Sequence, residues 1–500
     1  MDLACPTMRS RSAAAIPSNT DSPAISDRSR LANCRSPSFQ QCNALRLLTD
    51  FCHGRRPIDK WSLLSPETAF RSLVCAAANS ILQASIDKPD RLAAWFSKRH
   101  IMAIQRMRPS TYPAIFSYGF RPFFLLGSLQ AATAMLFWLP LYYGQLETFS
   151  AFAPVDWHIH ELLFGYLSAV VTGFLLTAIP NWTGRLPVQD LRLLVLVLLW
   201  IAGRIAVSFS AELGWLPGAV IDCSFLLAVV AAAATEIVAG RNWRNLKVLL
   251  PVAILFAANV MFHAEAHYQG ISDISRRLGL GAVALLIMII GGRIIPSFTR
   301  NWLVRENPGR VPTPFGGFDV GTIALSAVGL VAWTFFPNSI ATGFLLVAGA
   351  LANAGRMARW AGYRTLSDPL LLILHVAFAF VPIGLLLAGL AVFVPETIPE
   401  IAGIHALAVG AVAGMTLAVM TRATFGHTGR ELRASRGTCA IFMAIVLAAI
   451  LRIIAGVVPS YAVFLHISAA LWVAAFVGYT VQFGGMLVRP RLNARRKSAA

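Results

Sequence analysis

From Arg121 onward the chain alternates long apolar runs with short polar breaks that carry proline, glycine and asparagine. A helix needs about 20 apolar residues to cross the hydrocarbon core of a bilayer, and most of these runs have about that length. The pattern therefore predicts an all-α, polytopic membrane protein with about twelve transmembrane helices. The expected spans lie near residues 122–143, 157–179, 190–209, 215–238, 247–267, 278–296, 318–336, 340–355, 370–393, 401–421, 437–457 and 461–487.

The composition supports this prediction, since 57% of the 500 residues are hydrophobic and only 13% are charged. In a soluble domain about 25% of the residues are charged. A net charge of +19 is typical of nucleic-acid binding, but the basic residues lie in short loops between the apolar runs. We therefore expect membrane lipids around the chain and no nucleic acid as a partner.

The basic residues also predict the orientation of the spans. The loops after the even-numbered spans are rich in arginine, whereas the loops after the odd-numbered spans hold only Arg276 and Arg277, and several of them are acidic. Because arginine and lysine accumulate in cytoplasmic loops, both termini are expected to lie in the cytoplasm.

Residues 1–105 differ from the rest, since they are rich in serine, arginine, proline and cysteine and contain no run long enough to span a membrane. They are expected to be a poorly ordered extension, or to precede a true start at Met102 or Met107, with an amphipathic cytoplasmic tail as the alternative. Residues 106–490 are the expected membrane domain, and residues 491–500 are expected to form a basic cytoplasmic tail.

Histidines gather near the predicted outer ends of the spans, where six of the eight histidines of the membrane region fall. They are His158, His160, His263, His267, His405 and His466. Neutral imidazole is a common ligand of iron and copper, so the group predicts metal or haem binding. The blander interpretation is that these side chains form hydrogen bonds between helices, or that they carry protons in a transporter.

The spacing of the histidines predicts which of them work together. His263 and His267 are four residues apart and share a helix face, so both can reach one metal ion. His158 and His160 are two residues apart, on nearly opposite sides of a helix. They are expected to address different partners, with a structural role for one of them as the alternative.

Two arginines lie inside the spans at the same level, Arg204 in the third and Arg452 in the eleventh. A cation within a membrane needs an anionic partner, so these arginines are expected to pair with Glu161 or Glu265, or with haem propionates. No cysteine stands in a CxxC or CxxCH pattern. Covalent haem attachment is therefore not indicated, and any haem is expected to be a non-covalent, b-type group.

The second and tenth spans share part of their sequence at an offset of 245 residues, and we call this internal similarity the echo. The offset aligns His160 with His405, Gly165 with Gly410, and the TGR segment at 183–185 with the one at 428–430. An offset of 116 brings the sixth span into line, with Arg276 in the place of the histidine. From this spacing we infer three four-helix units. The layout is similar to that of the catalytic subunit of haem–copper oxidases, although the sixth span here has no histidine.

Four segments resemble the NnrS family, and the resemblance extends from about Thr111 to Arg489. The segments are FSYGFRPFFLLGSL (116–129), WHIHELLFGYLSAVVTGFLLTAIPNWTGRLP (157–187), GGRIIPSFTRNWL (291–303) and HALAVGAVAGMTLAVMTRATFGHTGR (405–430). The resemblance implies a bacterial inner-membrane protein that contains haem and copper and is linked to the nitric oxide response and to denitrification. Nitric oxide is then the expected small-molecule ligand.

Depth and spacing, rather than the resemblance, assign roles to individual residues. His160 and His405 lie on the two echoing spans and are the predicted haem ligands. Arg204 and Arg452 are the predicted partners of propionates or carboxylates. The predicted copper ligands are His263, His267 and His158.

Two other functions fit the same residues. Twelve spans with membrane histidines are also typical of a proton-coupled secondary transporter, although transporter repeats usually divide the spans into two halves. An assembly or support factor for another metalloenzyme is the third hypothesis. The sequence contains no phosphate-binding glycine loop and no Ser–His–Asp signature. Whether the protein is an enzyme therefore stays open, and the sequence does not identify an electron donor.

Overall fold

A computed structural model describes residues 111–458 and 462–492. Twelve helices in these ranges are long and apolar enough to cross a membrane, and the prediction of an all-α polytopic membrane protein is thereby confirmed. The expected extension (1–105) and nearly all of the expected tail (491–500) lie outside the described residues. The division of the chain into these parts therefore stays a prediction.

Twelve spans follow one another along the chain, and two of them are built from three helical segments each. The first six comprise α4 (Phe120–Tyr142), α5 (Pro154–His160) with η3 (Glu161–Tyr166) and α6 (Leu167–Thr183), α7 (Leu191–Ser208), α9 (Trp215–Ala239), α10 (Leu249–Gln269) and α11 (Ile274–Glu306). The last six comprise α12 (Gly317–Phe335), α13 (Ile340–Ala358), α14 (Pro369–Phe393), α15 (Glu400–His405) with η6 (Ala406–Ala413) and α16 (Gly414–His427), α17 (Arg436–Val457) and α18 (Ala462–Val488).

Two spans continue past the proline that was expected to end them. The second was expected to end near residue 179 and the sixth near 296. Instead α6 continues through Pro180 to its end at Thr183, and α11 continues through Pro296 to its end at Glu306. Proline removes one backbone donor from a helix, and membrane helices tolerate this loss where neighbouring groups satisfy the freed carbonyl.

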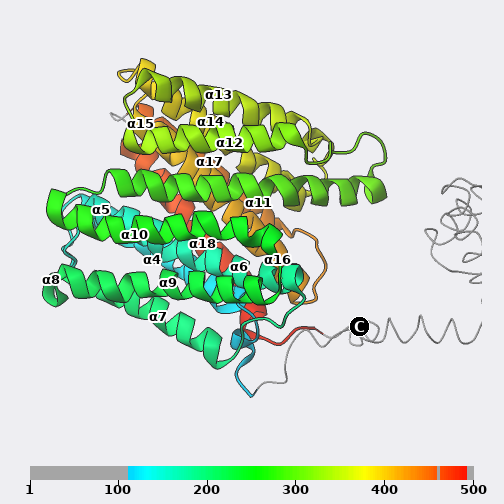
Figure 1. Cartoon of the computed structure of the whole chain (residues 1–500), viewed down its shortest axis with the longest axis horizontal. Helices are drawn as coiled ribbons and strands as arrows, with labels where there is room; N and C mark the ends of the chain where they lie inside the picture. Colours follow the sequence, from blue (N-terminus) through cyan, green and yellow to red (C-terminus); the bar gives the residue numbers. More distant parts are fainter. Residues whose placement is uncertain (1–110, 459–461, 493–500) are drawn as a thin grey trace, which may run out of the picture. The chain divides into compact units, whose positions relative to one another are not determined.

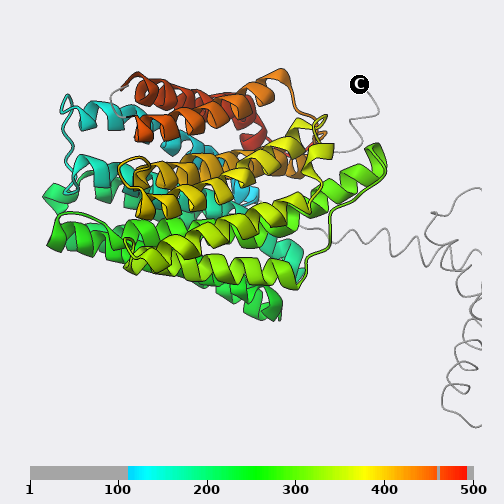
Figure 2. The same ribbon diagram turned by 90° about the horizontal axis from the view of Figure 1, so that it is seen from above.

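The helices run side by side, and their loops gather at the two ends of the bundle (Figures 1 and 2). One end carries the beginnings of α5 and α15, which lie on the left in Figure 1. We call it the histidine end, because α5 and α15 both finish on a histidine, His160 and His405. The other end, which carries arginine-rich loops, is called the arginine end.

The second and tenth spans form the centre of the bundle. Of their apolar stretches, 83% and 78% is buried inside the protein, compared with 33% to 61% in the other spans. Helices that are consecutive in the sequence pack on one another, and the last helix, α18, packs on the first span, α4. Side chains on the two central spans therefore face other helices more than they face lipid.

A π-helical segment follows directly after the histidine in both central spans. The segment η3 begins after His160, and η6 begins after His405. Segments of this kind are rare, they occur frequently at functional sites, and they change the direction in which the following side chains point. This shared irregularity agrees with the echo between the two spans, whereas the arrangement in three four-helix units stays a prediction.

Candidate metal and ligand sites at the histidine end

Six buried polar side chains meet between the second, third, fourth and fifth spans, and we call them the buried cluster. The cluster consists of His160 of α5, Glu161 of η3, Arg204 of α7, Asp222 of α9, and Asn259 and His263 of α10. Each of these residues keeps 8% or less of its surface exposed. Polar and ionisable groups are costly in a membrane protein unless they pair with one another.

Asp222 is the centre of the buried cluster. Its Oδ2 accepts a hydrogen bond from Nδ2 of Asn259 at 2.8 Å. The same oxygen lies 3.1 Å from Nε2 of His263 and 3.2 Å from Nε2 of His160. Its Oδ1 accepts a hydrogen bond from Arg204. One carboxylate on α9 thus connects α5, α7 and α10.

Arg204 pairs with both carboxylates of the cluster. Its guanidinium lies 2.6 Å from Oε1 of Glu161 and also contacts Asp222, and Gln130 of α4 donates to the other oxygen of Glu161. Of the partners expected for Arg204, the structure shows Glu161. One guanidinium against two carboxylates leaves one negative charge in excess when both histidines are neutral, so a further positive charge is needed for balance.

The ring of His160 faces hydrogen-bond acceptors on both sides. Its Nε2 lies 3.0 Å from Oδ1 of Asn259 and 3.2 Å from Oδ2 of Asp222, while its Nδ1 lies 3.4 Å from Oε1 of Glu161. A neutral imidazole has one N–H, so one nitrogen lone pair would point at a carboxylate. The ring is satisfied either as an imidazolium, or with a metal ion on Nε2 and a proton on Nδ1. Both states supply the missing positive charge.

Two glycines allow the close approach of α7 to its neighbours. A Cβ atom at Gly165 would lie 2.8 Å from a terminal nitrogen of Arg204, and a Cβ atom at Gly203 would lie 2.8 Å from Oδ1 of Asp222. The carbonyl of Gly165 also accepts a hydrogen bond from Nε1 of Trp200 at 2.9 Å. The Arg204 pairs therefore depend on residues without side chains at these two positions.

Three side chains of the buried cluster can hold a metal ion. One ligand atom each from His160, Asp222 and His263 lie within 4.8 Å of one another, and this is the one such group among the described residues. Two imidazoles and a carboxylate are donors that suit first-row transition metals. Asn259 holds Asp222 through its hydrogen bond, and Glu161 faces the second ring nitrogen of His160, as the supporting residues of metal sites commonly do.

A cavity of about 350 Å³ lies at the same end of the bundle and is lined by the opposite side of α5 and η3. The second, sixth and tenth spans all contribute to its walls, and most of the lining is apolar. Its charged and imidazole side chains are His158, Arg276, Arg277, Glu400, His405 and Arg452. The volume falls in the range of small-molecule and cofactor sites, about 300–1,000 Å³.

Several buried polar atoms around this cavity have no hydrogen-bond partner among the described residues. They are Nε1 of Trp138, Nδ1 of His158 and Nε of Arg276. The rings of Trp138 and His158 stack with their centres 4.2 Å apart, so the two unpaired nitrogens belong to neighbouring side chains. Buried polar atoms are almost always paired, and such a group indicates a place for a ligand or ordered water.

His405 presents a lone pair rather than an N–H at its Nε2. Its Nδ1 lies 2.9 Å from the carbonyl oxygen of Ile401, and because a carbonyl only accepts, Nδ1 carries the proton. A histidine held in this way is suited to bind a metal through Nε2. His466 makes the same contact with the carbonyl of Ala462. The two histidines differ because His405 lines the cavity, whereas His466 is exposed.

Arginines surround the apolar walls of the cavity. Arg277 donates to Glu400 at 2.8 Å, and Glu400 also accepts from Nε1 of Trp333 at 2.9 Å. Arg276 pairs with Asp273, and Arg452 reaches the cavity from α17. The cavity therefore combines imidazoles with cations that can neutralise the carboxylates of a bound group.

The structure divides the predicted site residues between the two sites. The buried cluster contains His160, His263 and Arg204, and the cavity is lined by His158, His405 and Arg452. His158 and His160 thus address different partners, as their spacing predicted. The cavity, however, brings His405 together with His158 and not with His160, which was the predicted second haem ligand. The ligand assignments themselves stay predictions.

His267 lies apart from both sites. Its exposed ring stacks on Trp215 with the ring centres 4.5 Å apart, whereas His263, one turn earlier, is buried against Asp222. The last turn of α10 extends beyond the packed core, so a shared helix face does not bring the two rings to one point. Glu265, between them, binds the beginning of α11 instead.

Asp222, Asn259 and Gln130 were not predicted from the sequence. Asp222 does carry a signal, because it is a carboxylate inside an apolar span, and an ionisable group within a membrane helix is a functional candidate by default. Asn259 stands four residues before His263, so the two share a face of α10. Gln130 carries no comparable signal, since a lone glutamine in a span is also compatible with a surface position.

Comparison with known proteins gives one informative result. A search of curated proteins finds no match. The model of one protein family, described as NnrS protein, matches residues 114–491, a range that includes the buried cluster and the cavity. The chain therefore belongs to the NnrS family and is a multi-pass membrane protein related to nitric oxide at the level of that family.

Proposed function

We propose that the protein binds haem in the cavity and a copper ion in the buried cluster, and that it serves the nitric oxide response of a bacterial inner membrane, in connection with denitrification. The observation that carries the proposal is that His158 and His405 line one cavity, and Nδ1 of His158 has no hydrogen-bond partner among the described residues. Family membership supports the link to nitric oxide. Two imidazoles from the two central spans then face one space large enough for a ligand.

The residues around the cavity fit haem in three respects. Imidazoles of His158 and His405 are available to the iron, the walls are apolar, and Arg452 can neutralise a propionate. Arg276 and Arg277 already pair with Asp273 and Glu400. In this proposal His158 takes the role that depth and spacing assigned to His160. Bound haem would supply an iron centre, and nitric oxide could bind to it once one of the two imidazoles leaves the iron. The chain itself holds the ring in place and excludes water.

The residues of the buried cluster fit a second metal ion. His160, Asp222 and His263 offer the ligand atoms, while Glu161 and Asn259 fix the orientation of the ligands. Imidazole donors suit copper, which forms stronger complexes than the neighbouring divalent metals. A divalent ion more than offsets the single excess negative charge of the cluster. Because only one residue separates His158 from His160, the two sites share one short segment of the chain.

Metal analysis and an optical spectrum test this proposal. Protein purified in detergent, from cells supplied with iron and copper, is expected to contain both metals and to show the intense absorption band of haem. Addition of nitric oxide without oxygen is expected to shift that band. Absence of haem would contradict the proposal, and both metals without any response to nitric oxide would favour a support role for another metalloenzyme.

A proton-coupled transporter is the second candidate, and the surroundings of His160 favour it. Acceptors face both ring nitrogens, which is the geometry of an imidazolium that holds a proton inside the bundle. Protein that contains neither iron nor copper, and that moves protons when reconstituted into lipid vesicles, would support transport. Retention of both metals with no proton movement would support the first candidate.

A further inference from the structure

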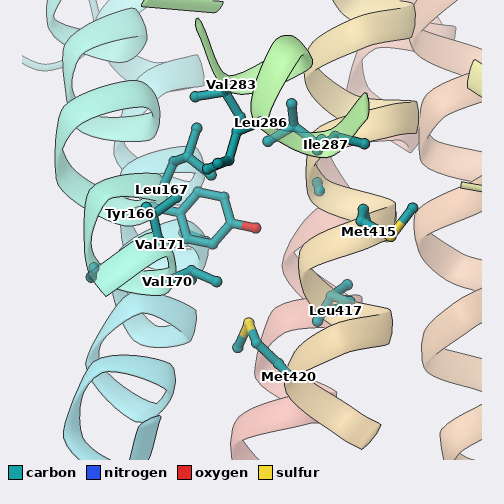
Figure 3. Packing of buried hydrophobic residues seen from close by; sticks show 14 of the residues in the cluster. Tyr166, Leu167, Val170, Val171, Val283, Leu286, Ile287, Met415, Leu417 and Met420 are labelled. Carbon is teal, nitrogen blue, oxygen red and sulfur yellow. The ribbon is translucent and has the colours of Figure 1, made fainter. Parts of the chain in front are cut away.

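A second, smaller pocket lies deeper in the bundle between α6, α11 and α16, and we call it the apolar side pocket. It has a volume of about 70 Å³. Its walls include Leu167 and Val171 of α6, Leu286 and Ile287 of α11, and Met415 of α16. Figure 3 shows these residues on helices that face one another. The second, sixth and tenth spans, which line the cavity, therefore also line this pocket.

The lining of the apolar side pocket offers nothing polar to a guest. Thr416 brings the one side-chain hydroxyl of the lining, and this hydroxyl already bonds with the hydroxyl of Tyr166 and donates to the carbonyl of Ala413 at 2.9 Å. Apolar cavities of this kind stay free of water and take up apolar guests such as xenon. The volume is far below the roughly 300 Å³ that organic ligands need, so the guest must be small.

The apolar side pocket adjoins the cavity. Leu167 lines both spaces, and Tyr166, which lines the cavity, forms its hydrogen bond with Thr416, which lines the pocket. Val412 of the cavity wall precedes Met415 of the pocket wall by three residues, so the two spaces lie about one helical turn apart along the tenth span. The Tyr166–Thr416 pair and Leu167 form the partition between them.

We propose that the apolar side pocket is a docking site for a small uncharged gas, and that it supplies this gas to the cavity. The inference rests on the proposed function, in which the gas is nitric oxide. Nitric oxide has almost no dipole and dissolves better in hydrocarbon than in water, so it gathers in a dry apolar space inside a membrane protein. The pocket holds the gas one turn from the cavity and excludes water and ions from the same route.

Xenon tests the docking site without any haem or copper. Crystals of the full-length protein under xenon pressure are expected to show one xenon atom in the apolar side pocket, and the variant Val171→Phe, which fills the pocket, is expected to lose it. Val328→Phe is the matched control, since Val328 is 57% exposed on α12. No xenon in the unmodified pocket, or the end of a lipid chain already bound there, overturns the proposal.

A second variant keeps the test decisive if Val171→Phe does not fold. Gly291 also lines the pocket, and a Cβ atom there would lie 3.5 Å from Phe378 and 3.6 Å from Ile295, which are ordinary contact distances. Gly291→Ala is therefore expected to fold normally and to weaken xenon binding. Xenon occupancy that is equal in Gly291→Ala and in the unmodified protein would count against the pocket.

Rapid mixing with nitric oxide tests the supply to the cavity. Val171→Phe is expected to slow the optical response several-fold and to leave the final spectrum unchanged, whereas Val328→Phe leaves both unchanged. An unaltered rate in Val171→Phe and Gly291→Ala overturns the proposed supply route. If the unmodified protein shows no optical response to nitric oxide, the proposed function fails, and the xenon experiment still decides whether the pocket binds a gas.

Discussion

The buried cluster and the cavity lie on two sides of the same helical segment, and they differ in whether their buried polar atoms have hydrogen-bond partners. In the cluster the oxygens of Glu161 and Asp222 have partners on several spans, and Nε of Arg204 is the unpaired exception. Around the cavity, nitrogens of His158 and Trp138 have no partner among the residues that the structure describes.

This difference indicates what each site can accept. The cluster is nearly complete by itself and has a place only for a small cation, either a proton or a metal ion between His160, Asp222 and His263. The cavity is incomplete and has a volume of about 350 Å³, so it requires a larger group from outside the chain. Two histidines separated by one residue thus serve two different kinds of site.

The largest expected effect comes from removing an imidazole of the cavity. His405→Ala is expected to abolish the haem absorption band. The substitution removes the imidazole whose Nδ1 carries the proton and whose Nε2 is left to bind iron. Absorption per protein chain is the measurement. His466→Ala is the matched control, since His466 has the same hydrogen bond to a carbonyl but lies exposed. An unchanged band in His405→Ala would place the haem outside the cavity.

Removal of the central carboxylate is expected to empty the cluster of copper without affecting haem. Asp222→Asn loses a charged ligand, whereas Asn259→Ala loses only a supporting hydrogen bond and is expected to lower copper affinity by about 10–100-fold. Copper titration in detergent measures both. His267→Ala should bind copper as the unmodified protein does, and a loss of copper in that variant would restore His267 as a ligand.

A smaller effect on stability is expected when the cation of the cluster is removed. Arg204→Ala leaves two buried carboxylates without their partner, and we expect a loss of about 3–5 kcal/mol of unfolding free energy. Arg185 pairs with Glu236 at 2.6 Å, but its side chain is 45% exposed, so Arg185→Ala should cost only about 0–1 kcal/mol. Thermal unfolding in the same detergent compares the two variants, and equal losses would contradict a buried ion-pair network.

The smallest expected effect concerns the space beside Arg204. Gly203→Ala would bring a Cβ atom to 3.1 Å from the Cα atom of Asp222, so α7 and α9 must separate at a cost of about 1–3 kcal/mol. At Gly321 of α12 a Cβ atom meets nothing within 4 Å, and Gly321→Ala is the control. A midpoint of thermal unfolding that is lower only for Gly203→Ala would confirm the close approach.

The fold was largely predictable because a membrane helix has to be apolar over its full length, and that property is visible in the sequence. The ends of two spans at the arginine end of the bundle were not predictable, since Pro180 and Pro296 remain within their helices. The π-helical segments after His160 and His405 were not predictable either. They depend on how the surrounding helices pack, and no residue type marks them.

The candidate sites were predictable in part. The gathering of histidines at one end, the separate partners of His158 and His160, and the pair between Arg204 and Glu161 all follow from spacing and charge. Spacing gives the angle between two side chains but not the rotation of the helix, which the neighbouring helices determine. For this reason the sequence did not show that His158, and not His160, lines the same cavity as His405.

Iron and copper contents of His158→Ala and His160→Ala, measured side by side with the unmodified protein, test the separation of the two sites most directly. The account predicts that His158→Ala loses haem iron and keeps copper, and that His160→Ala loses copper and keeps haem iron. Loss of haem iron in His160→Ala with retention in His158→Ala would contradict it, and so would loss of both metals from both variants.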